Sequence, residues 1–213
     1  MSVAIILIFV AIAIGVSIYR ERKAVPATES VKAKLSSALQ GLFVHPGHSW
    51  VNVTEPSLVT VGTDEFTKSV FGSVETVTLP ERGSMIQQGG KAWGFKRGKR
   101  QLVQTAPISG RVVEINQALY DNPEILKDKS PDRNWILKIQ PIGLSRQLRN
   151  LISGGTQSHW NQAVKEQLAS ILGTPEFAVL QDGGELVPDL GDHLTEEQWK
   201  KVNREFFAVN RNQ

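Results

Sequence analysis

The chain has 213 residues, no cysteine and a formal net charge of +3 at pH 7. The lack of cysteine excludes disulfides, iron–sulfur clusters and thiol catalysis, and so small a charge does not by itself indicate a nucleic-acid partner. An apolar fraction of 40% with five tryptophans is typical of a chain that buries a core, not of a disordered chain.

An uncharged apolar run lies near the start of the chain and reads VAIILIFVAIAIGVSIY from residue 3 to residue 19. As a helix it would be about 25 Å long, the short end of a membrane span. Arg20, Arg22 and Lys23 follow the run, and no basic residue precedes it. The positive-inside rule therefore predicts a single-pass membrane anchor with the C-terminal domain in the cytoplasm. A cleaved signal peptide and a buried core helix are the alternatives.

The rest of the chain divides by its composition. Pro26 prevents the anchor helix from continuing, so the residues after it are expected to form a tether. Strand signals follow the tether, and helix signals follow the strands. The predicted segments are an anchor with a basic flank at 1–23, a tether at 24–40, a β-rich domain at 41–144 and a helical appendage at 145–213.

The β-rich segment consists of short runs of strand-forming residues that alternate with Gly and Pro turns. This spacing, about 8 to 12 residues, is typical of an all-β sandwich or barrel. One helix is expected among the strands, from Thr63 to Phe71, with Gly72 as its stop signal. Trp135 is expected to be buried in the last core strand. The predicted strands are Leu42–Val53, Leu58–Val61, Ser73–Leu79, Gly110–Asn116 and Trp135–Ile139.

The motifs of this segment, taken in order, resemble those of the glycine cleavage system H protein family. The resemblance implies a β-sandwich of the lipoyl/biotinyl-carrier type, a barrel-sandwich hybrid that presents one lysine at the tip of a tight hairpin. Here that fold would carry C-terminal helices and one N-terminal transmembrane helix. The matching pieces are His48–Val51, Val61–Gly72, Leu79–Gly83, Ala106–Gly110, Val112–Asn116, Leu119–Glu124 and Trp135–Pro141.

The lipoyl lysine of the family corresponds to Lys99, whether the count starts at Leu79 or runs back from Ala106. The family hairpin resembles E-S-V-K-A, with an acid three residues before the lysine, whereas this chain has Lys96 in that place. A lipoylating enzyme reads the hairpin surface, and a reversed charge weakens such an interface. Lipoate on Lys99 is therefore a possible cofactor, and the competing interpretation is that Lys99 is one solvated charge among several.

Two functions of different class follow. The first is a membrane-anchored, non-catalytic interaction or adaptor module whose basic hairpin binds an anionic protein surface or anionic lipid, where each cation contributes about 1 kcal/mol. The alternative is a lipoylated carrier that shuttles an aminomethyl group on Lys99. Neither is an enzyme, and no nucleic-acid partner is expected, since Trp93 and Phe95 alternate as core residues do. The predicted partner-binding residues are Lys91, Lys96, Arg97, Lys99 and Arg100.

Two other groups of residues have structural explanations. His45 and His48 have no third ligand nearby, so no metal site is predicted. Asp182 and Glu185 flank two glycines and are expected to belong to a turn and not to an acid–base pair.

Two helices are predicted in the C-terminal appendage. The first has apolar residues at helical spacing from Trp160 onward and ends at Gly173. The second begins at Thr195, with Gln198 at the capping-box position. Their aromatic residues are expected to pack on the β-rich domain.

Overall fold

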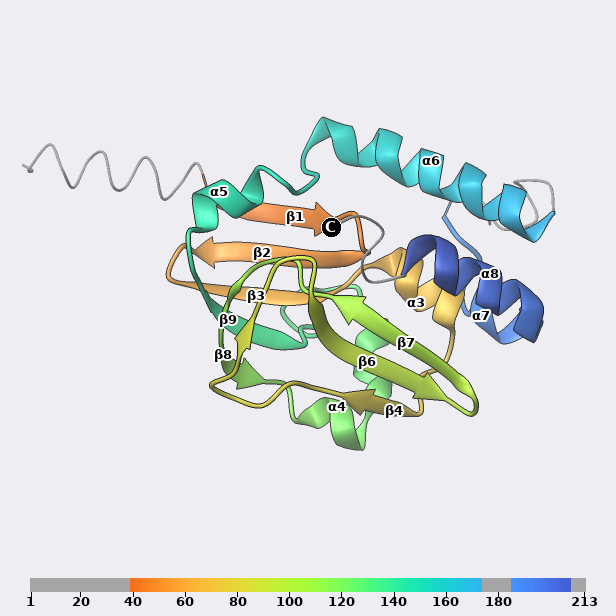
Figure 1. The fold of residues 1–213 in the computed structure, drawn as a ribbon, viewed down its shortest axis with the longest axis horizontal. Coiled ribbons are helices and arrows are strands. Elements are labelled where there is room, and N and C mark those ends of the chain that lie inside the picture. Colours follow the sequence, from red (N-terminus) through yellow and green to blue (C-terminus); the bar gives the residue numbers. More distant parts are fainter. Residues whose placement is uncertain (1–38, 174–184, 208–213) are drawn as a thin grey trace, which may run out of the picture. The chain divides into compact units, whose positions relative to one another are not determined.

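The computed structural model describes residues 39–173 and 185–207, which form two antiparallel sheets with helices around them (Figure 1). The strand order is β1-β2-β3-β9-β8-β5 in the larger sheet and β4-β6-β7 in the smaller. The strands of the larger sheet are β1 (Gly41–His45), β2 (Ser49–Glu55), β3 (Leu58–Thr63), β9 (Leu137–Pro141), β8 (Gly110–Ile115) and β5 (Met85–Ile86). Those of the smaller sheet are β4 (Thr76–Thr78), β6 (Lys91–Arg97) and β7 (Arg100–Thr105).

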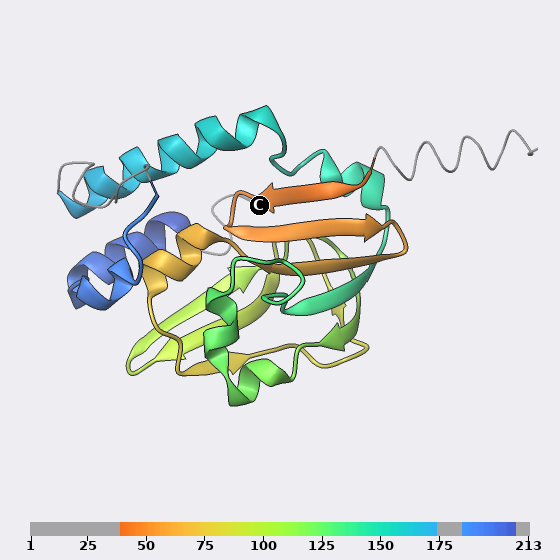
Figure 2. The same cartoon turned by 180° about the vertical axis from the view of Figure 1, so that it is seen from behind.

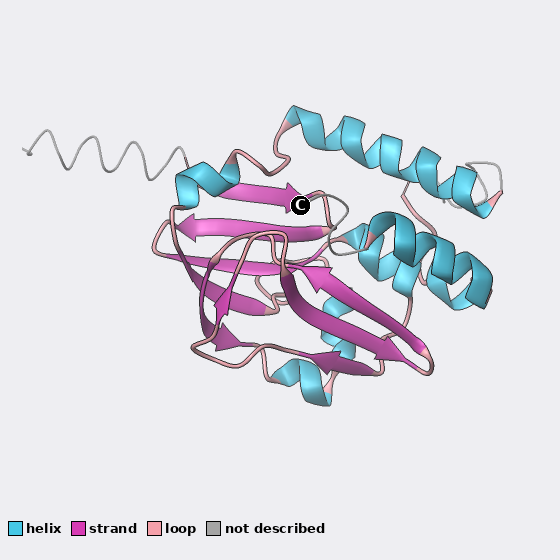
Figure 3. Ribbon diagram, viewed as in Figure 1, coloured by secondary structure: helices cyan, strands magenta, loops and turns pink. Residues whose placement is uncertain are grey.

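Figure 3 shows helices around the two sheets, and along the chain they fall into two groups, one between the strands and one after them. The fold is thus mainly β with C-terminal helices, as predicted. The helices between the strands are α3 (Glu65–Phe71), α4 (Ala118–Asp121) and the 3-10 helix η1 (Pro123–Lys127). Those after the strands are α5 (Leu144–Leu148), α6 (Gly155–Leu172), α7 (Leu190–His193) and α8 (Glu196–Phe206).

The predicted membrane anchor at 1–23 and almost all of the tether at 24–40 lie outside the described residues. Among residues 39–173 and 185–207, no helix combines the length and apolar character that a membrane crossing requires.

The core of the larger sheet depends on a close contact between two neighbouring strands. Trp50 of β2 pairs with Gly62 of β3, and the Trp50 indole donates a hydrogen bond to the Thr63 carbonyl at 2.8 Å. A Cβ atom on Gly62 would lie 2.4 Å from the indole ring, so a side chain there would displace it. Many buried side chains of the core are β-branched, the type that packs well on a pleated surface. They include Val51, Val59, Val61, Ile108, Val112 and Ile139.

The predicted helix after β3 is confirmed as α3. Its N-cap is Asp64, whose carboxylate accepts a hydrogen bond from the Thr67 backbone N–H at 2.9 Å. Its C-cap is Gly72, with a φ of 77°, a conformation that costs least for glycine. Phe66 and Val70 are buried on one face, as the spacing indicated.

The predicted burial of Trp135 is wrong. The last strand, β9, begins at Leu137, and Ile136, Leu137 and Ile139 are the residues fully buried there. Trp135 precedes the strand and is half-buried, with the Lys138 ammonium 4.7 Å from its ring centre. Apolar character alone did not identify which residues at the start of this strand face the core.

Both predicted C-terminal helices are confirmed. The first is α6, which ends at Gly173 in the left-handed conformation. The second is α8, with the complete capping box between Thr195 and Gln198. Its aromatic face packs on the β-rich domain, since buried Trp199 meets Phe71 of α3 edge to face at 5.4 Å.

The C-terminal helices α7 and α8 lie beside α3 (Figure 2), and a glycine allows this approach. Gly191 of α7 is buried, and a Cβ atom there would lie 2.3 Å from the Val70 carbonyl oxygen and 2.4 Å from the Phe71 carbonyl carbon. Any larger residue would push α7 away from the backbone of α3. This contact places the start of α8 beside the smaller sheet.

Candidate functional site

The candidate site is the hairpin formed by β6 and β7, whose loop consists of Gly98 and Lys99. Arg97 and Arg100 face each other across the last strand pair. Gly98 has a φ of 53°, which suits the glycine at the first loop position of a type II′ turn. This turn matches the twist of the two strands, so the hairpin closes in two residues and Lys99 lies at its tip.

Lys99 is a free amine in the part of the chain that the structure describes. Its side chain is exposed, and within residues 39–173 and 185–207 it makes no hydrogen bond or ion pair. A Cβ atom added to Gly98 would meet no atom within 4 Å, so the space beside the tip is open. Both features make the Lys99 side chain accessible.

The five predicted partner-binding residues do not form one patch. Lys91 lies at the opposite end of β6, six residues or about 20 Å from Arg97. Lys96 and Lys99 are exposed near the tip. Arg97 and Arg100 lie on the core-facing side of the hairpin, because each is two residues from a member of the buried pair Phe95 and Leu102 on its own strand.

Arg97 is bound by the C-terminal helices. Its guanidinium donates to the carboxylate of Asp192 in α7. Asp192 also accepts hydrogen bonds from the backbone N–H and the hydroxyl of Ser73, at 3.1 and 3.2 Å. Burial raises the pKa of the Asp192 carboxyl, but the Ser73 hydrogen bonds and the Arg97 charge outweigh burial, so its pKa lies below the ordinary value of 3.8.

Arg100 is bound by the same helices through several hydrogen bonds. It donates to the backbone carbonyls of Gly191 and Leu194 and to the Glu196 carboxylate at 2.9 Å. Its guanidinium also lies 6.0 Å from the centre of the Trp199 ring. The Arg100 side chain is 11% exposed, so its charge is directed into the protein and not toward a partner.

A third carboxylate holds the loop from the side of β4. The Glu75 side chain accepts a hydrogen bond from the Gly98 backbone N–H at 2.8 Å, and the Glu75 N–H donates to the Lys96 carbonyl at 3.0 Å. The hairpin that is purely basic in sequence is thus surrounded by three acids in space. They are Glu75, Asp192 and Glu196.

These acids were missed because they lie far from the hairpin in sequence. Asp192 and Glu196 are 95 and 96 residues from their arginine partners. One signal was available: Trp93 and Phe95 were recognised as core-facing, and the same alternation places Arg97 on that face. A cation that continues a buried face indicates a partner from elsewhere in the chain.

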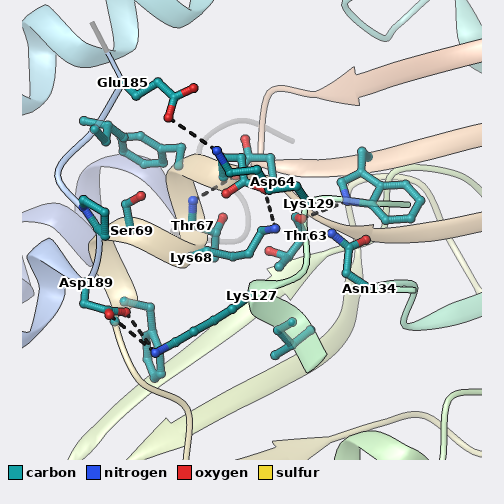
Figure 4. A pocket seen from close by; sticks show the side chains of 18 of the residues that line it. Thr63, Asp64, Thr67, Lys68, Ser69, Lys127, Lys129, Asn134, Glu185 and Asp189 are labelled. Atoms are coloured by element: carbon teal, nitrogen blue, oxygen red, sulfur yellow. Dashed lines mark hydrogen bonds and ion pairs between the residues drawn. The ribbon is translucent and has the colours of Figure 1, made fainter. Parts of the chain in front are cut away.

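A cavity of about 620 Å³ lies between α3, η1, α6 and residues 185–189 (Figure 4). Its wall is largely apolar and includes Val44, Trp50 and Phe71. Three lysines that line the cavity form ion pairs with acids. The pairs are Lys68–Glu65, Lys127–Asp189 and Lys129–Glu185. The described residues include no group of three metal-ligating side chains.

The two histidines have structural contacts. His48 is buried at a φ of 63°, its Nδ1 lies 2.9 Å from the Asp64 carboxylate, and its ring stacks on Phe66 at 4.1 Å. His45 accepts a hydrogen bond from the Gly47 N–H at 2.9 Å. Burial, with a contribution from nearby His48, lowers the pKa of His45 to about 4. Glu185 of the predicted turn pairs with Lys129, while Asp182 lies outside the described residues.

Comparison with known proteins agrees with the fold. The family described as glycine cleavage H-protein matches residues 42–166. A probable glycine cleavage system H protein from Thermococcus kodakarensis is 33% identical over 132 residues, 62% of this chain and 92% of that protein. The glycine cleavage system H protein from Geobacillus sp. is 34% identical over 119 residues, 56% of this chain and 90% of the relative.

A solved structure adds a likeness of fold. The glycine cleavage system H protein from Mycobacterium marinum superimposes with a TM-score of 0.51 at 23% identity, covering 57% of this chain and 96% of that one. The family match spans more than half of the 213 residues. The chain therefore belongs to the glycine cleavage H-protein family.

Proposed function

We propose that this protein is a lipoylated carrier of the H-protein type and that Lys99 is its attachment residue. The observation that carries the proposal is the state of Lys99: an exposed lysine at the tip of a two-residue hairpin, without a partner among the described residues. Family membership supports this function over the adaptor function that the basic sequence favoured. The charge argument against lipoylation is also weaker than the sequence indicated, because Arg97 and Arg100 are bound by carboxylates.

The residues of the hairpin fit an acylated lysine. Amide formation requires an accessible neutral amine, and the open space beside Gly98 leaves room for an acyl donor. When bound, lipoate supplies a dithiolane at the end of a long arm, on which an aminomethyl group can be carried between partner enzymes. The chain's own part is to hold the Lys99 backbone at a fixed place, and the paired strands and the Glu75 hydrogen bond to Gly98 support that role.

The membrane anchor remains part of the proposal. Residues 3–19 would attach the carrier to a membrane, with the domain on the cytoplasmic side. A second function, a basic adaptor surface, is favoured by one observation: Lys96 is exposed on the outer face of β6, next to Lys99. Two cations at a tip form a weaker anionic-surface site than the predicted five.

Intact-mass analysis of the protein purified from its own host tests the proposal. We expect the mass of one lipoyl amide on the wild-type chain, its complete loss in Lys99→Arg and its retention in Lys96→Arg. Unmodified Lys99 in cells that contain other lipoylated proteins would overturn the carrier function.

A further inference from the structure

We infer that helices α7 and α8 determine the recognition of Lys99 by its acylating enzyme, because they neutralise the two arginines that flank the hairpin loop. This inference rests on the carrier function proposed above. The two helices lie at residues 190–193 and 196–206, beyond the matched family segment that ends at residue 166. They are an addition to the H-protein fold, and they contact the hairpin next to its tip.

The first argument is electrostatic. The tip carries four cations within five residues: Lys96, Arg97, Lys99 and Arg100. Asp192 and Glu196 come from the C-terminal helices and pair with the two arginines. Without these acids, an enzyme that acylates Lys99 would meet three unpaired cations beside it: Lys96, Arg97 and Arg100. Like charges brought together at an interface weaken association. With the acids in place, Lys99 and Lys96 are the cations directed to solvent.

The second argument is mechanical. Strand β4 pairs with β6 as far as Lys96, so the hairpin beyond that residue has no third strand beside it. A two-stranded hairpin alone is only marginally stable in water. The α7–α8 segment supports this unpaired end through the carbonyls of Gly191 and Leu194, which accept from Arg100, and through the Asn203 amide, which donates to the Gln101 carbonyl at 3.4 Å.

Substitutions in the Arg97–Asp192 pair can distinguish the electrostatic role of the C-terminal helices from their packing role. Asp192→Asn removes the charge but keeps an oxygen that can accept from Ser73, so the contact between α7 and the hairpin persists. Arg97 then becomes an unneutralised cation two residues from Lys99. Adding Arg97→Gln to this variant removes that cation and leaves a neutral pair of similar shape.

The experiment measures acylation of the full chain in detergent by a lipoate–protein ligase with lipoate and ATP. We expect Asp192→Asn to lower kcat/KM for Lys99 about tenfold, mainly through KM, the factor that about 1.4 kcal/mol produces. Asp192→Asn with Arg97→Gln should return to within about twofold of wild type. The control is Glu197→Gln, whose side chain is 82% exposed and pairs with Lys201 on α8 itself; it should acylate like wild type.

The possible outcomes are distinguishable. Equal acylation of all four chains would overturn the inference and leave the carrier function standing. A loss in Asp192→Asn that Arg97→Gln does not restore would also overturn it, because that pattern indicates a structural contact without a charge effect. Failure of the wild-type chain to be acylated would overturn the carrier function as well.

Discussion

Two cross-strand contacts of this protein are held by different means. Trp50 lies against Gly62 in the larger sheet and is 5% exposed, so burial and one hydrogen bond to Thr63 hold it. Arg97 lies opposite Arg100 at the end of the hairpin, and side chains and carbonyls about 95 residues away hold that pair. The first contact forms within one pair of neighbouring strands. The second requires the C-terminal helices to pack against the hairpin.

This difference teaches which changes should affect stability and which should affect recognition. A buried aromatic side chain contributes by the area it removes from water and by close packing. A partly exposed ion pair contributes little to stability, because water screens it and the side chains lose entropy. The charges of such a pair still act electrostatically on an approaching partner protein.

The largest expected effect is at the buried contact. Trp50→Ala should lower the free energy of unfolding by about 3 to 5 kcal/mol, through lost apolar burial and the cavity that remains. Urea unfolding followed by circular dichroism measures it. The matched control is Trp135→Ala, a half-buried tryptophan, which should cost about 1 kcal/mol. Equal losses for the two tryptophans would contradict the distinction.

The next effect is a loss of folding stability at acidic pH, caused by His45. The His45 ring nitrogen lies 3.4 Å from the hydroxyl of Thr105, the last residue of β7. The pKa of His45 falls from 6.5 to about 4 on folding, so between these values the unfolded chain binds the proton first. The contribution of neutral His45 to the free energy of unfolding is therefore fully present above pH 6.5. It decreases by about 3 kcal/mol as the pH falls toward 4.

Urea unfolding at several pH values tests this assignment. In His45→Asn, the side-chain oxygen can still accept from the Gly47 N–H, but nothing titrates. That variant should lose less stability than wild type between pH 6.5 and 4. A pH dependence identical to that of wild type would show that another group is responsible.

A smaller effect is expected where α7 meets α3. Gly191→Ala places a Cβ atom against the Val70 carbonyl and the Phe71 backbone, and such overpacking costs about 1 to 3 kcal/mol. Because α7 carries Asp192, which binds Arg97, its displacement should also expose the tip to trypsin after Arg97, Lys99 and Arg100. Limited proteolysis measures that exposure, and slow cleavage identical to that of wild type would argue against a role of α7 in holding the hairpin.

The smallest stability effect is at the ion pair itself. Asp192→Asn should change the free energy of unfolding by less than about 1 kcal/mol at neutral pH, since both partners are about a quarter exposed. Since folding lowers the pKa of Asp192, its contribution is present above pH 3.8 and is lost below that value. A stability loss at pH 7 comparable to that of Trp50→Ala would show that this pair has a structural role similar to that of the core.

Much of the fold was readable from local sequence. Several strands, α3 with its Gly72 stop and α8 with its Thr195 capping box depend on residues a few positions apart, so local patterns predicted them. The predicted run Leu42–Val53 is two strands, β1 and β2, joined by a turn, and β5, β6 and β7 were not among the predicted strands. The placement of Lys99 at the hairpin tip was readable as well, through the family resemblance and the spacing between Leu79 and Ala106.

What the tertiary structure decided is the environment of that lysine. By itself the sequence determined a basic hairpin with Lys99 in its loop, and it predicted Arg97 as one of the partner-binding cations. It did not determine that Asp192, Glu196 and Glu75 surround the hairpin, because charge pairing depends on distance in space and carries no periodic signal along the chain. Likewise, the burial of Trp135 depended on where β9 begins, since one residue of register moves a side chain to the other face of a sheet.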